Sequence, residues 1–242
     1  MSLVRVRTKI FMPTSGTVKY QTVSAAFYGS NSVMTARDLP AADASQESAV
    51  ERHAHHARLL EGMTKALAAK GYADTTIADI VREAAVSRRS FYEHFATKAD
   101  CLLALYEAAS EQALVVLIGA VDPLQPWQTQ VEHAVTAYLD FLAEDPALLK
   151  TLFVEILGLG LPGLAVRRKV NAQIAGFILA ATVGEQGARL TPELAMTVVG
   201  GINELILQAV EGERSTDLRR LVEPATQLIR AVALNGVAKG SD

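Results

Sequence analysis

The sequence has little of several features that define protein classes. It contains one cysteine, Cys101, so no internal disulfide can form and a reducing cytoplasm is the natural setting. Its net charge is −3, which excludes nucleic-acid binding through bulk positive charge. Its longest apolar runs, at 113–121 and 174–183, fall far short of the ~18 residues that a membrane-spanning helix needs. We therefore expect a soluble chain, without membrane contact, that binds its partners through local patches.

Aromatic residues are scarce at 6% and eight prolines occur, whereas half of the 242 residues are apolar. This balance is typical of an all-α fold, and the length allows one large or two small domains. Only residues 3–11 alternate loosely as a strand would. We predict helices at 48–70, 100–119, 127–143, 147–157, 162–186 and 191–213, and a last one from 215–217 to 235–236. Pro224 either kinks this last helix or marks its true start.

The most informative stretch runs from Thr75 to Lys98 and predicts two short helices joined by a tight turn. Thr76 and Asp79 have the spacing of a capping box at the start of the first helix. An apolar stripe follows at helical spacing, formed by Ile77, Ile80, Val81 and Ala84. Ala85 and Val86 make the turn, and Ser87 can cap the second helix.

The second helix places two guanidinium groups and a phenol within a narrow arc. Arg88, Arg89 and Tyr92 share this arc, and Ser90 lies on the far side. The N-terminal end of a recognition helix contacts base edges and phosphates in the major groove. The stretch therefore predicts a helix-turn-helix. Because the region from Glu51 to Tyr106 holds eight basic and seven acidic residues, its DNA contact depends on a local patch.

Residues 57–106 resemble the DNA-binding domain of the TetR family. The family pattern has an aromatic residue after the glycine that ends its first helix, a Thr pair, an Ile-Ala dipeptide, a turn, an aromatic-rich second helix and a lysine that opens the fourth. The matching residues are Gly71-Tyr72, Thr75-Thr76, Ile77-Ala78, Ala85-Val86-Ser87, Phe91-Tyr92-Glu93-His94-Phe95 and Lys98. Ala85 departs from the pattern, since the family usually has glycine there. The match covers about a fifth of the chain, and its order and spacing are restrictive.

The resemblance implies an all-α fold of about nine helices and a three-part chain. Residues 1–46 would be an N-terminal extension, for which we expect disorder. Residues 47–97 would be the DNA-binding domain, and 98–242 a ligand-binding and dimerisation domain. Helices 8 and 9 of two chains would form a four-helix dimer interface, where Gly200, Gly201 and Ala195 would permit close approach. Two short recognition helices would then sit about one DNA turn apart on a pseudo-palindrome.

Within the helix-turn-helix, the predicted roles follow from side-chain chemistry. Arg88 and Arg89 can each bond guanine O6 and N7, so we assign them to base contacts. Thr76, Ser87, Tyr92, His94 and Lys98 are the predicted phosphate contacts, which position the protein without reading sequence. Tyr92 and His94 have an alternative role in packing the turn. Arg52 and Arg58 are further candidates for contact with the DNA backbone or an adjacent minor groove.

The resemblance also implies a ligand cavity among helices 4 to 8. Its predicted lining combines apolar residues with polar residues on otherwise apolar faces, which could orient a ligand. These residues are Leu103, Trp127, His133, Tyr138, Phe141, Phe153, Glu155, Gln173, Phe177 and Asn203, with Leu114 and Leu152 among the apolar surroundings. For each polar residue taken singly, a satisfied buried group or a solvated one is the alternative. We expect an apolar or amphipathic small molecule, with no cofactor and no metal.

Three other patterns each allow a functional and a structural interpretation. His53, His55 and His56 lie near the start of the first helix, but no accompanying set has metal-ligand spacing. The glycines from Gly158 to Gly163 match G-x-G-x-x-G, but they follow a predicted helix, so a loop is favoured over a dinucleotide site. Residues 1–33 are either an extension outside the fold or a basic arm that touches DNA.

The sequence therefore predicts a sequence-specific DNA-binding regulator in a bacterial cytoplasm. We expect a homodimeric repressor that a small effector releases from operator DNA. The alternatives are a helical enzyme, for which no nucleophile elbow, paired metal ligands or phosphate loop is present, and a nucleoid-type DNA binder without an effector.

Overall fold

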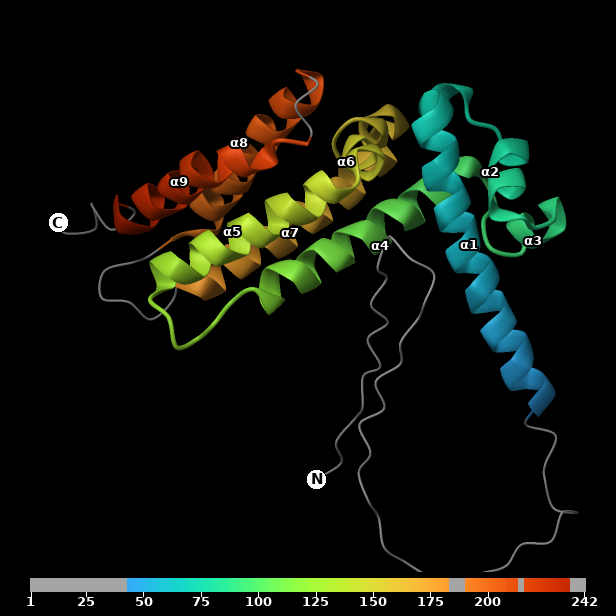
Figure 1. The fold of residues 1–242 in the computed structure, drawn as a ribbon, viewed down its shortest axis with the longest axis horizontal. Coiled ribbons are helices and arrows are strands. Elements are labelled where there is room, and N and C mark those ends of the chain that lie inside the picture. The colour runs from blue at the N-terminus through green and yellow to red at the C-terminus, as the bar shows by residue number, and fades with distance from the viewer. Residues whose placement is uncertain (1–42, 183–189, 213–215, 236–242) are drawn as a thin grey trace, which may run out of the picture. The chain divides into compact units, whose positions relative to one another are not determined.

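The computed structural model describes residues 43–182, 190–212 and 216–235, and the chain from Ala44 onward forms one compact unit. Every regular element of these residues is helical (Figure 1). The first four helices are α1 (Asp43–Asp74), α2 (Ile77–Ala84), α3 (Arg88–Tyr92) and α4 (Lys98–Gly119). The remainder are α5 (Trp127–Glu144), α6 (Pro146–Phe153), the 3₁₀ helix η1 (Glu155–Leu159), α7 (Leu161–Thr182), α8 (Pro192–Glu211), the 3₁₀ helix η2 (Leu218–Leu221) and α9 (Val222–Asn235). The predicted all-α fold is confirmed for this part of the chain.

Several helix boundaries differ from the predicted ones. Helix α1 begins at Asp43, five residues before the expected start, and Gly71 interrupts it with φ 72° and ψ 171° instead of closing it. Helix α6 ends at Phe153 because the chain tightens into η1. Pro224 is the third residue of α9, so it marks the start of that helix, where its missing N–H costs no hydrogen bond. Predictions for 1–42, 183–189, 213–215 and 236–242 lie outside the described residues.

Local capping explains where most helices begin. Thr97 and Asp100 form a capping box at α4, and Asp145 caps α6 with Pro146 at its first position. Thr191 caps α8 in the same way, with Pro192 following. These helices begin within two residues of the predicted starts at 100, 147 and 191.

The buried side chains form two hydrophobic clusters that meet along α4. The smaller cluster joins α1, α2 and α3 to the start of α4, through Cys101, Leu102 and Leu105. The larger cluster takes over at Tyr106 and Ala109 and extends through α5 to α9. Helix α4 therefore belongs to both cores, and any shift along it is felt in both.

Cys101 lies at the centre of the smaller cluster. The residue is fully buried, and its Sγ lies 4.0 Å from the Leu59 carbonyl oxygen. Burial raises the pKa of this thiol to about 12, with a further contribution from nearby Asp100. The group therefore behaves as a small apolar side chain.

Two described helices, α4 and α8, are long and apolar enough to cross a membrane, judged by length and composition alone. This finding contradicts the expectation that no segment has the length of a membrane-spanning helix. This is weak evidence for a membrane protein, because core helices of soluble proteins pass the same test.

Candidate nucleic-acid interface and effector cavity

The Asp79 carboxylate organises the corner between α1 and α2. It accepts hydrogen bonds from Lys70 Nζ at 2.8 Å and Arg82 Nη1 at 3.0 Å. It also accepts from the Thr76 hydroxyl at 2.7 Å and the Thr76 backbone N–H at 3.1 Å, which completes the predicted capping box. Lys70 above all, together with Thr76, holds the pKa of this carboxyl far below its usual range. The hydroxyl of Thr76 is thus already engaged within the chain, although the residue is exposed.

The turn between α2 and α3 places a non-glycine residue in the left-handed region. Ala85 has φ 50° and ψ 45°, and its N–H bonds to the Arg82 and Val81 carbonyls. This conformation favours glycine because a Cβ crowds the backbone there. The departure from the family pattern at this position therefore carries a conformational cost.

Helix α3 presents its basic end to solvent. The Ser87 side chain accepts a hydrogen bond from the Ser90 N–H at 3.0 Å and so caps the helix. Arg88 and Arg89 are exposed beyond this cap, and Arg89 Nε lies 3.1 Å from the Glu93 carboxylate. Tyr92 is 59% exposed, and its ring packs edge-on against that of Phe91. The structure brings Ser87, both arginines and Tyr92 together on one short surface helix.

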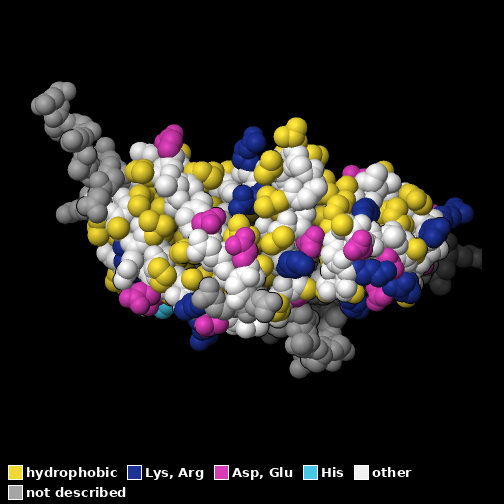
Figure 2. Space-filling model, turned by 90° about the horizontal axis from the view of Figure 1, so that it is seen from above, with side chains coloured by type: hydrophobic (Ala, Val, Ile, Leu, Met, Phe, Trp, Pro, Cys, Tyr) yellow, Lys and Arg dark blue, Asp and Glu magenta, His cyan; other side chains and the backbone are white. Residues whose placement is uncertain are grey.

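Basic groups do not form a continuous surface on the face drawn in Figure 2, where Lys and Arg side chains alternate with Asp and Glu. This distribution agrees with the small net charge of −3. A protein of this kind depends on a few well-placed arginines for contact with DNA.

Lys98 has a different role from the predicted phosphate contact. Its ammonium group donates to the carbonyls of Tyr72 at 2.8 Å, Ala73 at 3.2 Å and Thr75 at 2.8 Å. It also lies 4.4 Å from the centroid of the Tyr72 ring. All three ammonium protons are engaged within the chain, so Lys98 fastens the C-terminal end of α1 to the start of α4.

His94 packs beneath the helix-turn-helix beside a second histidine. Its ring lies 5.7 Å from that of His56, and Phe95 contacts both. Burial lowers the pKa of each imidazole, and neighbouring positive groups, including His55 for His94 and His94 for His56, lower it further. The Nε2 atom of His94 is buried without a partner among the described residues. An imidazole that is neutral at pH 7 carries no charge toward a phosphate, which weakens the predicted contact at this position.

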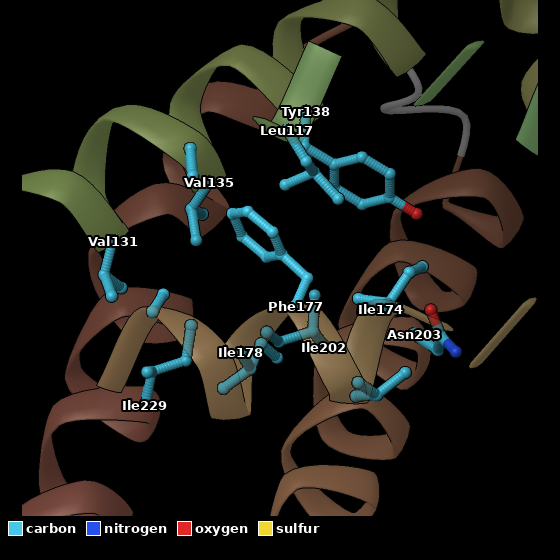
Figure 3. Close-up of a pocket in the computed structure, with 13 residues that line it drawn as sticks. Leu117, Val131, Val135, Tyr138, Ile174, Phe177, Ile178, Ile202, Asn203 and Ile229 are labelled. Atoms are coloured by element: carbon cyan, nitrogen blue, oxygen red, sulfur yellow. The ribbon is translucent and has the colours of Figure 1, made fainter. Parts of the chain in front are cut away.

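Two cavities that share lining residues lie among α4, α5, α6, α7, α8 and α9. The first has about 550 Å³ of space between its walls, a figure that includes open solvent, and these walls are almost wholly apolar (Figure 3). Figure 3 shows the Tyr138 hydroxyl and the Asn203 amide toward one end, with Val131 and Ile229 toward the other. The second cavity encloses about 370 Å³, and both share Tyr138, Ile174 and Asn203. The space therefore changes along its length from apolar to polar.

The predicted cavity residues divide into three groups. Tyr138, Phe177 and Asn203 line the first cavity, and Phe153 lines the second. The other apolar candidates pack into or against the larger core without lining either cavity; they are Leu103, Trp127 and Phe141. His133 and Gln173 are exposed, so the structure does not bring them to the cavity.

Glu155 lies away from the cavities and contacts the DNA-binding region instead. Its Oε2 accepts a hydrogen bond from the Tyr72 N–H at 3.1 Å, and its Oε1 lies 3.5 Å from Lys150 Nζ. The carboxylate thus links η1 to the residue that follows the Gly71 break in α1. Sequence reasoning assigned Glu155 to the ligand because it could not see this contact between distant segments.

Arg167 and Tyr106 were missed as cavity residues. Both line the second cavity with Ser110 and Asn171. Arg167 shares the helical face of Gly163, Val170 and Ile178, which are buried. An arginine at that spacing within an apolar stripe was the available signal.

The sequence model of bacterial regulatory proteins of the tetR family matches residues 59–105. Residues 59–105 therefore form a DNA-binding domain of the TetR type. The described residues have the family's fold, with a helix-turn-helix domain at the N-terminal end. The matched residues are thus those of a DNA-binding domain found in bacterial regulatory proteins.

Solved structures support the TetR-like fold. FadR, the fatty acid degradation regulator of Bacillus halodurans, superimposes with a TM-score of 0.63 at 17% identity, covering 77% of this chain and 97% of that one. FadR of Bacillus subtilis, in complex with stearoyl-CoA, gives 0.60 at 17% identity, covering 72% and 97%. A tetR-family regulatory protein from Rhodococcus RHA1 gives 0.57 at 22% identity, covering 72% and 96%. No curated protein matches the chain by sequence.

The G-x-G-x-x-G stretch has no dinucleotide-binding context among the described residues. It runs from η1 into α7 and has no preceding strand in that part of the chain. Gly163 is needed because an added Cβ would collide with the Ile156 carbonyl oxygen. Gly163 therefore allows α7 to pack closely on η1.

Proposed function

We propose that the protein is a homodimeric repressor in a bacterial cytoplasm, released from its operator by an amphipathic small molecule. One observation carries the proposal: a single chain combines an exposed, arginine-bearing helix α3 with an apolar cavity inside its larger core. A protein that only coats DNA needs no such cavity. The domain division follows from the same contrast, with residues 47–97 for DNA and 98–242 for ligand and partner chain.

The DNA contact is assigned by exposure and chemistry. Arg88 and Arg89 would read base edges from the start of α3, and Ser87, Tyr92 and Thr76 would contact phosphates around them. Because α3 has five residues, one copy offers few contacts. A second copy about one DNA turn away would supply the missing affinity.

The proposed dimer interface comprises α8 and α9. A Cβ at Gly200 would meet nothing within 4 Å, so this side of α8 is open to close approach. Ala195 is fully buried and Gly201 packs against Leu228 of α9, so these two small residues serve contacts within the chain. Gly200 alone among the three is available to a partner helix.

The effector is proposed from the cavity, with support from a structural neighbour. The apolar walls around Phe177 suit a hydrocarbon chain, and the B. subtilis FadR structure contains stearoyl-CoA. A ligand that favours one conformation would alter DNA binding through the contacts that join the larger, cavity-containing cluster to the smaller cluster of α1 to α3. Glu155 and Lys98 both hold the segment around Tyr72, so a shift of η1 or α4 would move the helix-turn-helix.

The test is DNA binding by the full chain at fixed salt, with fragments from around its own gene and a panel of long-chain lipids. We expect palindrome-centred binding that one lipid class weakens at least tenfold. Arg88→Ala should weaken binding by about 1–3 kcal/mol and relax the sequence preference. Arg220→Ala, which alters an exposed arginine of η2, is the matched control and should bind like the original chain.

Two outcomes would overturn the proposal. Weak binding at every sequence with a steep salt dependence would indicate phosphate contacts alone and favour a nucleoid-type binder. An unchanged sequence preference in Arg88→Ala and in Arg89→Ala would remove the assignment of these residues to base contacts.

A further inference from the structure

Arg167 is an arginine without a protein partner at the polar end of the cavities. It lines the second cavity from α7 and is partly buried. Within the described residues it makes no ion pair or hydrogen bond, whereas Lys169, two residues on, pairs with Glu107 at 3.0 Å. Neither cavity has an acidic residue in its lining. The positive charge of Arg167 is therefore uncompensated from the protein side.

Two phenols lie close to this guanidinium group. Burial raises the pKa of both Tyr106 and Tyr138, and the positive charge of Arg167 opposes the rise in each. The Tyr106 hydroxyl bonds to Ser110, whereas the Tyr138 hydroxyl has no partner among the described residues. Both phenols stay protonated at neutral pH, so Tyr138 has a hydrogen to donate.

The nearby amides do not provide a counter-charge. Asn203 Nδ2 donates to Asn171 Oδ1 at 3.1 Å, so these two neutral amides pair with each other between α7 and α8. The available donors at the polar end are consequently the Arg167 fork and the Tyr138 hydroxyl. Both residues line the second cavity, and Tyr138 also lines the first.

We propose that Arg167 and the Tyr138 hydroxyl bind the carboxylate of an unesterified long-chain carboxylic acid whose hydrocarbon chain occupies the apolar cavity. A carboxylate carries one negative charge and accepts two parallel hydrogen bonds from a guanidinium group. It therefore neutralises the one cation in the cavity lining. The proposal rests on the proposed effector role of the cavity and names the chemistry of that effector.

Other head groups fit this end less well. A phosphate monoester has a charge near −2, and one arginine would leave about half of it unpaired in a site that excludes much water. A thioester or methyl ester has a neutral carbonyl, which would leave the Arg167 charge uncompensated. The preference for the free acid is thus a consequence of one buried cation with no partner.

The experiment measures binding of four compounds to the full chain by calorimetry: dodecanoic acid, its methyl ester, dodecanol and dodecanoyl-CoA. We expect the acid to bind about tenfold or more tightly than the other three. Arg167→Ala should abolish this preference, and Arg167→Lys should restore part of it. Tyr138→Phe should reduce it while the apolar chain still binds, because the ring is retained.

Arg168→Ala is the matched control, since Arg168 is the next residue and is exposed. It should leave the preference for the acid unchanged. Thermal unfolding of each variant checks that it folds, and Arg167→Ala removes no described hydrogen bond. The Tyr138→Phe result stands independently if an arginine variant is unstable.

The proposal is overturned if the ester or the CoA thioester binds as tightly as the acid, if Arg167→Ala keeps the preference, or if none of the compounds binds. Release of DNA is measured separately with the same compounds. An acid that binds without releasing DNA would leave the carboxylate site intact and contradict the repressor mechanism. A compound that releases DNA, in a protein that shows no preference for the acid, would support the repressor mechanism and contradict the carboxylate site.

Discussion

The two functional regions are stabilised by different forces. The DNA-binding region is fastened by charged and polar groups, with Asp79 joining α1 to α2 and Lys98 joining α1 to α4. The cavity region is held by apolar packing, and two of its polar groups, Arg167 and the Tyr138 hydroxyl, have no partner among the described residues. In the region for DNA, the charged groups that fix its shape are engaged with one another or with backbone carbonyls. In the region proposed to receive a ligand, Arg167 and the Tyr138 hydroxyl are available to bind it.

Gly62→Ala is expected to have the largest effect, because it pushes α1 away from α2. It should damage the DNA-binding region and spare the cavity region. An added Cβ would lie 2.6 Å from the Ile80 carbonyl oxygen and 2.9 Å from the Ala84 Cβ. Overpacking against backbone should lower the free energy of unfolding by about 2–3 kcal/mol and weaken DNA binding, while ligand binding persists. Urea unfolding and calorimetry measure the two effects.

Gly176→Ala is the control for this substitution. Its added Cβ meets nothing within 4 Å on α7, so the helix should gain about 0.5–1 kcal/mol. Equal stability changes in the two variants would show that the close contact of α1 with α2 is not limiting.

Lys98→Met should have an intermediate effect, because it leaves three carbonyl oxygens at the end of α1 without their donor. We expect a loss of about 1–3 kcal/mol in the free energy of unfolding. The slope of log K for DNA against log salt should not change, since Lys98 neutralises no phosphate. A shallower slope would reinstate the phosphate contact. Lys65→Met, at an exposed lysine paired with Glu61, should change stability by less than about 0.5 kcal/mol.

Ala85→Gly is expected to give the smallest effect and to stabilise. Glycine adopts φ 50° without a Cβ clash, so the DNA-binding region should gain about 0.5–1 kcal/mol in thermal or urea unfolding. Ala78→Gly, in the body of α2, is the matched control and should lose a similar amount. Destabilisation in both variants would mean that the turn gains nothing from the freedom of glycine.

The fold was predictable wherever its determinants lie close together in sequence. The capping pair Thr76/Asp79 spans three residues and forms as predicted, and Thr97/Asp100 forms the same arrangement at α4. Pro224 could not be placed, because the choice between a kink and a start depends on the 3₁₀ helix that packs before it. The end of α6 at Phe153 could not be predicted either, because it depends on the 3₁₀ helix η1 that follows. Gly163 packs there against Ile156.

The site was less predictable because its contacts join distant segments. Lys98 and Tyr72 are 26 residues apart, and Glu155 and Tyr72 are 83 apart, so no local pattern reveals either bond. His133 and Gln173 interrupt apolar stretches of sequence but face solvent from their helices. Arg167 was within reach, since its spacing from Val170 places it on the buried face of α7.

The burial of Cys101 also makes the protein well suited to distance measurements. A chain whose single thiol has a pKa of about 12 and no solvent exposure gives little background with maleimide dyes. Ala96→Cys, at an exposed position after α3, would therefore accept one fluorophore per chain without removal of the native cysteine. Energy transfer between two labelled copies on DNA would then report the spacing of their recognition helices directly, in solution and at single-molecule dilution.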